Sequence, residues 1–354
     1  SGGIWLGGRG RGGNAAASRV WKGETVGCEQ AIEDRFGRRF PYLRLSVTDV
    51  CNFKCTYCLP DGYQKSHGDS FMNTAEIRRL VTAFAEMGTW KIRLTGGEPT
   101  VRPDFYEIAR LVANTPGIEK TAFTTNGYKL PQRAKDYFAA GLRAINISID
   151  SLDPRRFHEI TGHDRLGEVV DGVQAALDAG FEAVKINTVL LKGMNDDEID
   201  GFLSFVEGRP VSLRFIELMQ TGDNLAYFRK HHVPATIVKE KLLQRGWHLR
   251  ERDAGAGPAM EYAHPDYQGR IGIIAPYSKD FCKTCNRLRI SARGQLHLCL
   301  FGTGGYDLRP LLQNDNQIDE LKDQVMNLMQ FKKLSHFLQD GNTGARPHLA
   351  SVGG

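Results

Sequence analysis

Short β-like runs alternate with helical patterns between residues 43 and 218, which predicts an α/β protein with parallel βα units. We expect a partial (β/α)6 barrel of the TIM type, followed by a C-terminal extension, because the pattern changes after about residue 220. A chain of 354 residues is long enough for both. The expected parts are a leader (1–35), the barrel (36–222), the extension (223–340) and a tail (341–354).

The barrel is predicted from six strands and the helices between them. The strands are expected at 43–47, 91–95, 121–126, 144–150, 183–190 and 212–218. Helices are expected over 73–88, 167–180 and 195–208, where apolar residues recur with helical spacing. Asn73 and Glu76 follow the capping-box pattern at the start of the first helix. Asn195 and Glu198 follow the same pattern at the start of the last.

Several strands carry polar residues on one face and apolar residues on the other. Arg44, Arg93, Asn146 and Lys185 each stand between apolar neighbours. In a parallel sheet the apolar face packs against the helices, so the polar face would line an interior cavity. Buried cations without partners are costly, so this face predicts a polar ligand. The alternative is the solvent face of an antiparallel sheet, which the intervening helices disfavour.

The extension has its own sequence of elements. We expect helices over 228–246 and 317–338, a loop over 251–262, a strand over 269–276 and a hairpin over 286–301. The hairpin would turn near Gly294 and carry Cys299.

Composition excludes several classes of protein. The net charge is +5, from 46 Lys and Arg against 41 Asp and Glu, which disfavours a broad nucleic-acid surface. No apolar run approaches the roughly 18 residues of a membrane span. Seven cysteines, odd in number, argue against a disulfide framework and for a reducing, cytoplasmic compartment.

The first thirty residues are rich in Gly, Arg and Ala and lack the apolar stretch of a secretory signal. A transit peptide and an RGG-like RNA-binding arm are both open interpretations. We favour a disordered or vector-derived leader.

Three cysteines with C-x3-C-x2-C spacing, Cys51, Cys55 and Cys58, follow the first strand. Three thiolates bind three irons of a [4Fe–4S] cube and leave the fourth iron open to another ligand. A zinc site would need a fourth protein ligand, for which His67 is the nearest candidate.

A second group of three cysteines lies in the extension, at Cys282, Cys285 and Cys299. Its spacing fits a second open [4Fe–4S] cluster, and also a zinc site completed by His297.

The motif TGGEP at 95–99 follows directly on the second strand. Its glycines would let the backbone approach a ligand closely. Together, the cysteine loop and this motif resemble the radical S-adenosylmethionine (radical SAM) superfamily. Finer strings, such as FIELMQTGDN and FCKTCNRLRISARGQLHLCLFG, resemble those members that cyclise GTP in molybdenum cofactor biosynthesis.

The resemblance implies a set of ligands and contacts. Cys51, Cys55 and Cys58 would hold the first [4Fe–4S] cluster, and Cys282, Cys285 and Cys299 the second, whose open iron receives guanine. S-adenosylmethionine would be bound by Tyr57, Gly97, Ser148 and Met219. GTP would be bound by Arg44, Arg93, Thr124, Lys185, Arg287, Leu288 and Arg289. Gly353 and Gly354 would reach the active site and be needed for cyclisation.

The implied reaction is radical. An electron from the first cluster cleaves S-adenosylmethionine to methionine and a 5′-deoxyadenosyl radical, which removes the ribose 3′ hydrogen of GTP. The resulting carbon radical closes on guanine C8, and one further electron and a proton at N7 give (8S)-3′,8-cyclo-7,8-dihydroguanosine 5′-triphosphate. A reductant such as a flavodoxin or ferredoxin and a downstream pterin-forming enzyme would be the partners, with a homodimer allowed and neither membrane nor nucleic acid involved.

Two other functions fit parts of the sequence. One is a radical enzyme with a different substrate, such as a peptide, that uses the second cluster as an electron relay. The other is a non-catalytic zinc or iron–sulfur module that binds nucleic acid through the leader. Iron and zinc analysis separates these alternatives.

Overall fold

The computed structural model describes residues 31–65, 70–252, 255–302, 304–344 and 349–352. Their strands form one twelve-stranded sheet. The strands are β1 (Tyr42–Ser46), β2 (Lys91–Thr95), β3 (Lys120–Thr125), β4 (Ala144–Ser148), β5 (Ala183–Leu190), β6 (Ser212–Glu217), β7 (His248–Leu249), β8 (Met260–Ala263), β9 (Arg270–Ile274), β10 (Arg287–Ile290), β11 (Gln295–His297) and β12 (Tyr306–Asp307).

The helices alternate with the strands through the first part of the chain. The α-helices are α1 (Thr74–Glu86), α2 (Phe105–Ala113), α3 (Leu130–Ala139), α4 (Pro154–Thr161), α5 (Leu166–Asp178), α6 (Ile199–Glu207), α7 (Leu225–His231), α8 (Thr236–Gln244) and α9 (Ile318–Met329). Short 3₁₀ turns are η1 (Pro99–Val101), η2 (Arg309–Leu312), η3 (Asp315–Gln317), η4 (Leu338–Asp340) and η5 (Ala350–Val352).

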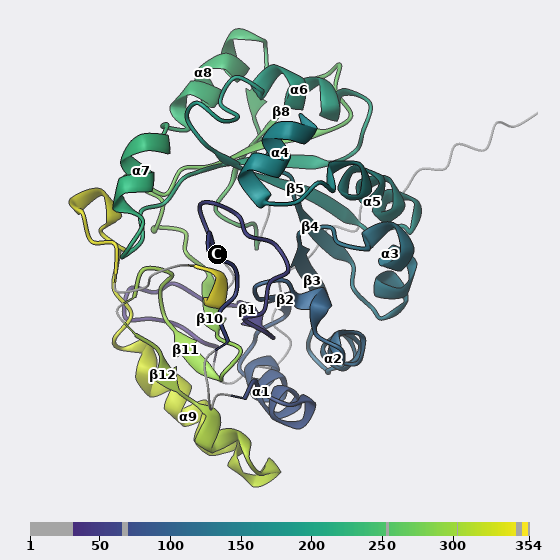
Figure 1. Ribbon diagram of the computed structural model, residues 1–354. Coiled ribbons are helices and arrows are strands. Elements are labelled where there is room, and N and C mark those ends of the chain that lie inside the picture. Colours follow the sequence, from purple (N-terminus) through teal and green to yellow (C-terminus); the bar gives the residue numbers. More distant parts are fainter. Residues whose placement is uncertain (1–30, 66–69, 253–254, 303, 345–348, 353–354) are drawn as a thin grey trace, which may run out of the picture.

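The sheet order is β12-β11-β10-β1-β2-β3-β4-β5-β6-β9-β8-β7. The strands β1 to β6 are parallel neighbours in chain order, which confirms the predicted α/β fold with a parallel sheet. The extension continues this sheet at both sides, because β10 pairs in parallel with β1 and β9 with β6. Figure 1 shows β10 and β1 to β5 as a curved row, with α1, α2, α3 and α5 on its outer side.

The apolar strand faces form the core with those helices. Along β5 the burial alternates strictly, and Val184 and Ile186 are buried while Lys185 is only half-buried. The same alternation places Leu43 and Leu45 of β1 in the core at 0% exposure. The opposite face of each strand is therefore directed to the inside of the curve.

The predicted capping box of α1 is confirmed. The Asn73 side chain accepts a hydrogen bond from the Glu76 amide (2.9 Å), and the Glu76 carboxylate accepts one from the Asn73 amide (2.8 Å). Local hydrogen bonding thus decides where this helix begins.

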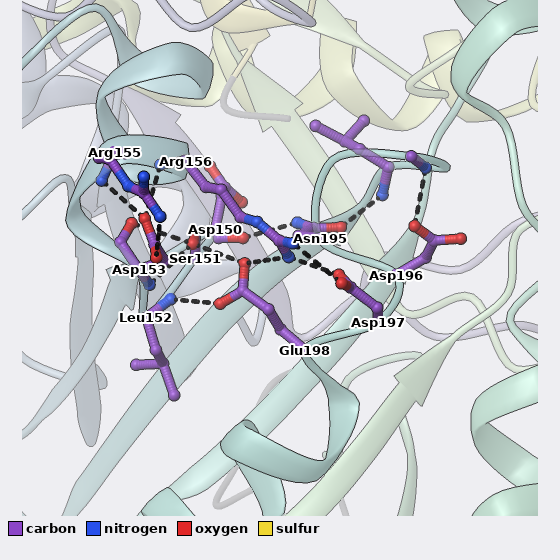
Figure 2. A network of polar contacts seen from close by, with 12 residues as sticks. Asp150, Ser151, Leu152, Asp153, Arg155, Arg156, Asn195, Asp196, Asp197 and Glu198 are labelled. Atoms are coloured by element: carbon purple, nitrogen blue, oxygen red, sulfur yellow. Dashed lines mark hydrogen bonds and ion pairs between the residues drawn. The ribbon is translucent and has the colours of Figure 1, made fainter.

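The second predicted capping box is wrong. The helix α6 begins at Ile199, and the Asn195 side chain donates instead to the carbonyls of Asp150 (2.6 Å) and Val189 (2.8 Å). The Glu198 carboxylate accepts from Ser151 Oγ (2.7 Å) (Figure 2). Buried carbonyls need hydrogen-bond donors, so these partners from other elements hold the Asn195 side chain away from the start of the helix.

The extension follows the expected pattern except in three places. The strand β8 begins at Met260 inside the predicted loop, the helix α9 ends at Met329 rather than at 338, and one predicted helix is divided in two. The region 228–246 contains the end of α7 and all of α8, which are separated around Pro234. The predicted hairpin is confirmed as β10 and β11, with Cys299 two residues after β11. Residues 31–35, assigned to the leader from sequence, include Ile32 and Asp34, which are only 2% and 5% exposed. None of the described helices is both long and apolar enough to cross a membrane.

Candidate active site

A cavity of about 310 Å³ lies on the inner face of the curved sheet. Its lining comes from the strands β1 to β6 and β10, the two cysteine loops and the turn η5. Figure 1 shows η5, in yellow, on the inner side of the row of strands. A volume of this size falls in the range of small-molecule sites.

The first cysteine loop lies between β1 and α1, and Cys51, Cys55 and Cys58 all line the cavity. The end of α4 holds this loop, because the amides of Lys54 and Thr56 donate to the carbonyls of Thr161 (3.0 Å) and Ile160 (2.9 Å). The three thiols are thereby presented together on one side of the cavity.

Burial raises the pKa of each thiol in the first group, to about 11 for Cys51 and about 12 for Cys58. The pKa of Cys55 is raised by burial, and then by Asp150 and the neighbouring thiols. Thiolates at these positions therefore need positive charge beside them. Iron supplies that charge, so the donor set fits an iron–sulfur cluster.

Tyr57 and Asp150 connect the cysteine loop to the end of β4. The Tyr57 hydroxyl donates to the Asp150 carboxylate (2.8 Å), whose other oxygen accepts from the Val189 amide (2.8 Å). Burial is the main cause that raises the pKa of Asp150 to about 6. Tyr57, Gly97, Ser148 and Met219, the residues predicted for S-adenosylmethionine, all line the cavity.

Gly97 is required by a close approach of the chain to itself. A Cβ at this position would lie 2.5 Å from the Val50 carbonyl oxygen and 2.6 Å from that of Asp49. The Gly97 amide donates to the Thr48 carbonyl (3.0 Å). The glycine therefore lets the loop after β2 pack directly on the cysteine loop, a reason that the sequence had not indicated.

The second cysteine group is assembled from two segments. Cys282 and Cys285 precede β10, Cys299 follows β11, and all three line the same cavity as the first group. Burial raises the pKa of Cys282, whereas at Cys285 Lys332 and Arg287 outweigh burial and lower the pKa. His297 is not in the cavity lining and its Nδ1 lies 3.1 Å from the Gly304 carbonyl oxygen.

The arrangement of the thiols bears on the zinc alternative. Within the described residues, no three His, Cys, Asp or Glu side chains are close enough together to hold a single metal ion. His67, the other zinc candidate, lies outside the described residues.

Cationic side chains line the cavity on the side of β1, β2, β5 and β10. The register places Arg44 directly between Arg93 of β2 and Arg289 of β10. The predicted nucleotide-binding residues that line the cavity are Arg44, Arg93, Thr124, Lys185, Arg287 and Arg289. Leu288 does not, because the strand alternation directs it into the hydrophobic core at 1% exposure.

Several side chains of the cavity lining have polar atoms without a hydrogen bond within the described part of the chain. Buried polar atoms without a hydrogen bond include Nε of Arg44, Arg93 and Arg214. Thr124 Oγ1, Asn146 Oδ1 and Asn187 Oδ1 are likewise unpaired, and these three side chains also line the cavity. Burial, together with Arg214 and Arg93, lowers the pKa of Lys185 well below its usual value. A polyanion with hydrogen-bonding groups would satisfy these atoms.

Three further residues of this cluster were missed from the sequence. Tyr42, Lys91 and Arg214 line the cavity beside the predicted cations. Lys91 Nζ donates to the Gly255 carbonyl (3.1 Å), and Arg214 forms an ion pair with Glu261 (3.1 Å). All three lie on the polar face of their strands, so the same alternation could have identified them.

The tail reaches the cavity. Leu349 and Ala350 line it, and the Val352 carbonyl accepts a hydrogen bond from Arg289 Nη1 (2.9 Å). Gly353 and Gly354 lie outside the described residues.

Comparison with known families agrees with this geometry. Residues 45–206 match the sequence model of the Radical SAM superfamily. Residues 211–338 match the model called Molybdenum Cofactor Synthesis C. The fold and the first cysteine loop, with this match, define the class of protein as the radical SAM superfamily, whose members use a [4Fe–4S] cluster and S-adenosylmethionine.

Curated relatives identify the family within that class. The chain is 56% identical to the GTP 3′,8-cyclase of Aeromonas hydrophila over 91% of this chain and 96% of that protein. It is 54% identical to the GTP 3′,8-cyclase of Vibrio parahaemolyticus over 94% of this chain and all of that protein. The chain therefore belongs to the GTP 3′,8-cyclase family.

Solved structures support the fold alone. SuiB of Streptococcus suis bound to S-adenosylmethionine aligns with a TM-score of 0.57 at 14% identity, covering 80% of this chain and 68% of SuiB. SuiB bound to its precursor peptide SuiA aligns with a TM-score of 0.58, also at 14% identity, covering 89% and 70%.

Proposed function

We propose that this protein is a GTP 3′,8-cyclase that acts at an early step of molybdenum cofactor biosynthesis. The observation that carries the proposal is that both cysteine groups and the cationic strand face line one cavity. A reaction between two bound molecules needs such a shared, enclosed space, because it holds the reacting atoms in contact.

The first cysteine group and its neighbours would form the S-adenosylmethionine side of the site. Cys51, Cys55 and Cys58 would hold one cluster, and the curved row β1 to β6 would act as a partial barrel around it. When bound, this cluster and S-adenosylmethionine supply the radical chemistry that takes hydrogen from the ribose. The chain's own part is to orient both molecules and exclude water.

The second cysteine group would form the guanine side. Cys282, Cys285 and Cys299 would hold a second cluster with an open iron, next to Arg287 and Arg289. The remaining cations would bind the triphosphate, for which Arg guanidinium groups have matching geometry. Three partners of this protein stay predictions. They are an electron donor such as a flavodoxin or ferredoxin, a downstream enzyme that forms the pterin, and a second copy of the chain in a homodimer.

Metal analysis tests the assignment of two clusters. We expect about eight irons per anaerobically purified chain and no zinc, since each cluster contains four irons. A content of about four irons and one zinc would agree with a cluster at the first cysteine group, but it would contradict a second cluster at Cys282, Cys285 and Cys299.

Isotope transfer tests the reaction itself. With GTP deuterated at ribose C3′, we expect deuterium to appear in 5′-deoxyadenosine together with formation of the cyclised nucleotide. Cleavage of S-adenosylmethionine without deuterium transfer would point to the alternative substrate, such as a peptide. No cleavage in the fully reconstituted protein would contradict the proposal as a whole.

Lys185 provides a test of the triphosphate site. Because Arg214 and Arg93 repel its ammonium group, Lys185→Ala should cost little stability. We expect the Kd for GTP to rise about ten- to a hundredfold, as for loss of one charge-assisted contact. Titration calorimetry measures it, with the exposed Lys239→Ala of α8 as a control that should bind normally. Unchanged affinity in Lys185→Ala would remove this residue from the site.

A further inference from the structure

Tyr42 occupies a central position among the cations of the cavity. At the start of β1 it lies directly between Lys91 of β2 and Arg287 of β10 in the strand register. Its ring is 4.6 Å from Lys91 Nζ and 5.8 Å from the Arg93 guanidinium carbon. The ring therefore separates cations that would otherwise face each other across the sheet.

The hydroxyl of Tyr42 is not held by a hydrogen bond among the described residues. The residue is only 4% exposed and lines the cavity. No hydrogen bond joins this hydroxyl to any residue in the described part of the chain. A phenylalanine would make the same ring contacts, so the hydroxyl at the cavity is the one feature that distinguishes tyrosine here. The position of the hydroxyl thus points to a ligand.

We propose that Tyr42 is a further substrate-binding residue, whose hydroxyl donates a hydrogen bond to an oxygen of the nucleotide's triphosphate. This inference rests on the proposed function. Phosphate oxygens only accept hydrogen bonds. A neutral donor such as a tyrosine hydroxyl can therefore bind them alongside the surrounding cations. Such a donor adds a directed hydrogen bond without adding further repulsion between the cations.

The charge around Tyr42 makes this contact depend on pH. The groups that face it are Arg44 of β1, Lys91 and Arg93 of β2, Arg287 and Arg289 of β10, and Arg214 of β6. Burial alone would raise the pKa of Tyr42, but the nearby cations outweigh it and lower the pKa to about 7. Above pH 7 the free site therefore loses the proton that the bond requires. A bound polyanion favours the protonated form of Tyr42. Binding of the triphosphate above pH 7 therefore requires the Tyr42 hydroxyl to take up a proton.

Tyr42→Phe tests the inference in the anaerobically reconstituted protein. We expect the Kd for GTP to rise about ten- to a hundredfold at pH 7, while the Kd for guanosine, which has no phosphate, stays unchanged. Tyr262→Phe is the matched control, because Tyr262 is 1% exposed in the core and does not line the cavity. Its affinity for GTP should be that of the wild type.

The pH profile supplies a measurement that a merely structural role would not change. Between pH 7 and pH 8.5, GTP affinity should fall more steeply in the wild type than in Tyr42→Phe, which has no proton to lose. Lys91, with a pKa lowered to about 8 chiefly by burial, contributes to the fall in both proteins. Parallel profiles, unchanged GTP affinity in the variant, or an equal loss for guanosine would overturn the inference. A wild type that binds no GTP would instead contradict the proposed function.

Discussion

Cys55→Ser is expected to abolish reductive cleavage of S-adenosylmethionine, whereas Cys299→Ser should leave cleavage largely intact and weaken GTP binding. The reason is that the two thiols line one cavity but belong to different loops, one after β1 and one after β11. If each loop holds its own cluster, the loss of one ligand should affect one partial reaction. The measurements are 5′-deoxyadenosine release with dithionite and GTP binding by calorimetry, both without oxygen.

Iron content provides the control for this pair. Each variant should lose about four irons and keep the other cluster, since a cube needs its three thiolates. An equal loss of cleavage in both variants, with one cluster still present in each, would contradict separate roles for the two cysteine groups.

Gly354→Ala should strongly reduce the cyclised product while both clusters, GTP binding and part of the cleavage of S-adenosylmethionine remain. The described tail supports this expectation, because Val352 is only 1% exposed and its carbonyl accepts a hydrogen bond from Arg289. The turn η5 also packs against β1, and Ala350 lines the cavity. The last described residues of the tail therefore lie beside the cavity, and the family resemblance implies that the two glycines after them are needed for cyclisation.

Product formation relative to cleavage is the decisive measurement for the tail. Gly201→Ala in α6 is the matched control, since this glycine has an ordinary φ and its added Cβ would meet only Leu152 Cδ1, at 4.0 Å. It should keep full activity. Full product formation by Gly354→Ala would show that the tail does not enter the reaction.

The strands and their polar face could be predicted from the sequence because both depend on neighbours in the chain. Alternation with period two decides which side chains of β5 are buried, and it placed Lys185 on the cavity side before any contact was known. The capping box of Asn73 and Glu76 is equally local. Cysteine spacing likewise indicated two groups of three thiols, although their ligation stays a prediction.

Other features depend on partners far away in the chain. Asn195 has the right spacing for a helix cap, but its side chain binds the carbonyl of Asp150 after β4 and that of Val189 in β5 instead. Gly97 is needed because the loop after β1 passes within van der Waals distance of its backbone. Leu288 belongs to the string that resembles a nucleotide site, yet its strand face is directed into the core.

The sequence by itself determined the α/β fold, the two cysteine groups and the place of Arg44, Arg93 and Lys185, because each follows from periodicity or spacing along the chain. Arg287 and Arg289 came from the family resemblance. Only the tertiary structure decided that these parts meet. Parallel pairing of β10 with β1 brings Arg287 beside Tyr42 and Arg289 beside Arg44, across more than two hundred residues of sequence. Strand register is a property of the packed sheet, since it depends on which strands become neighbours and how their faces are buried. The central position of Tyr42 among the cations could therefore be found only there.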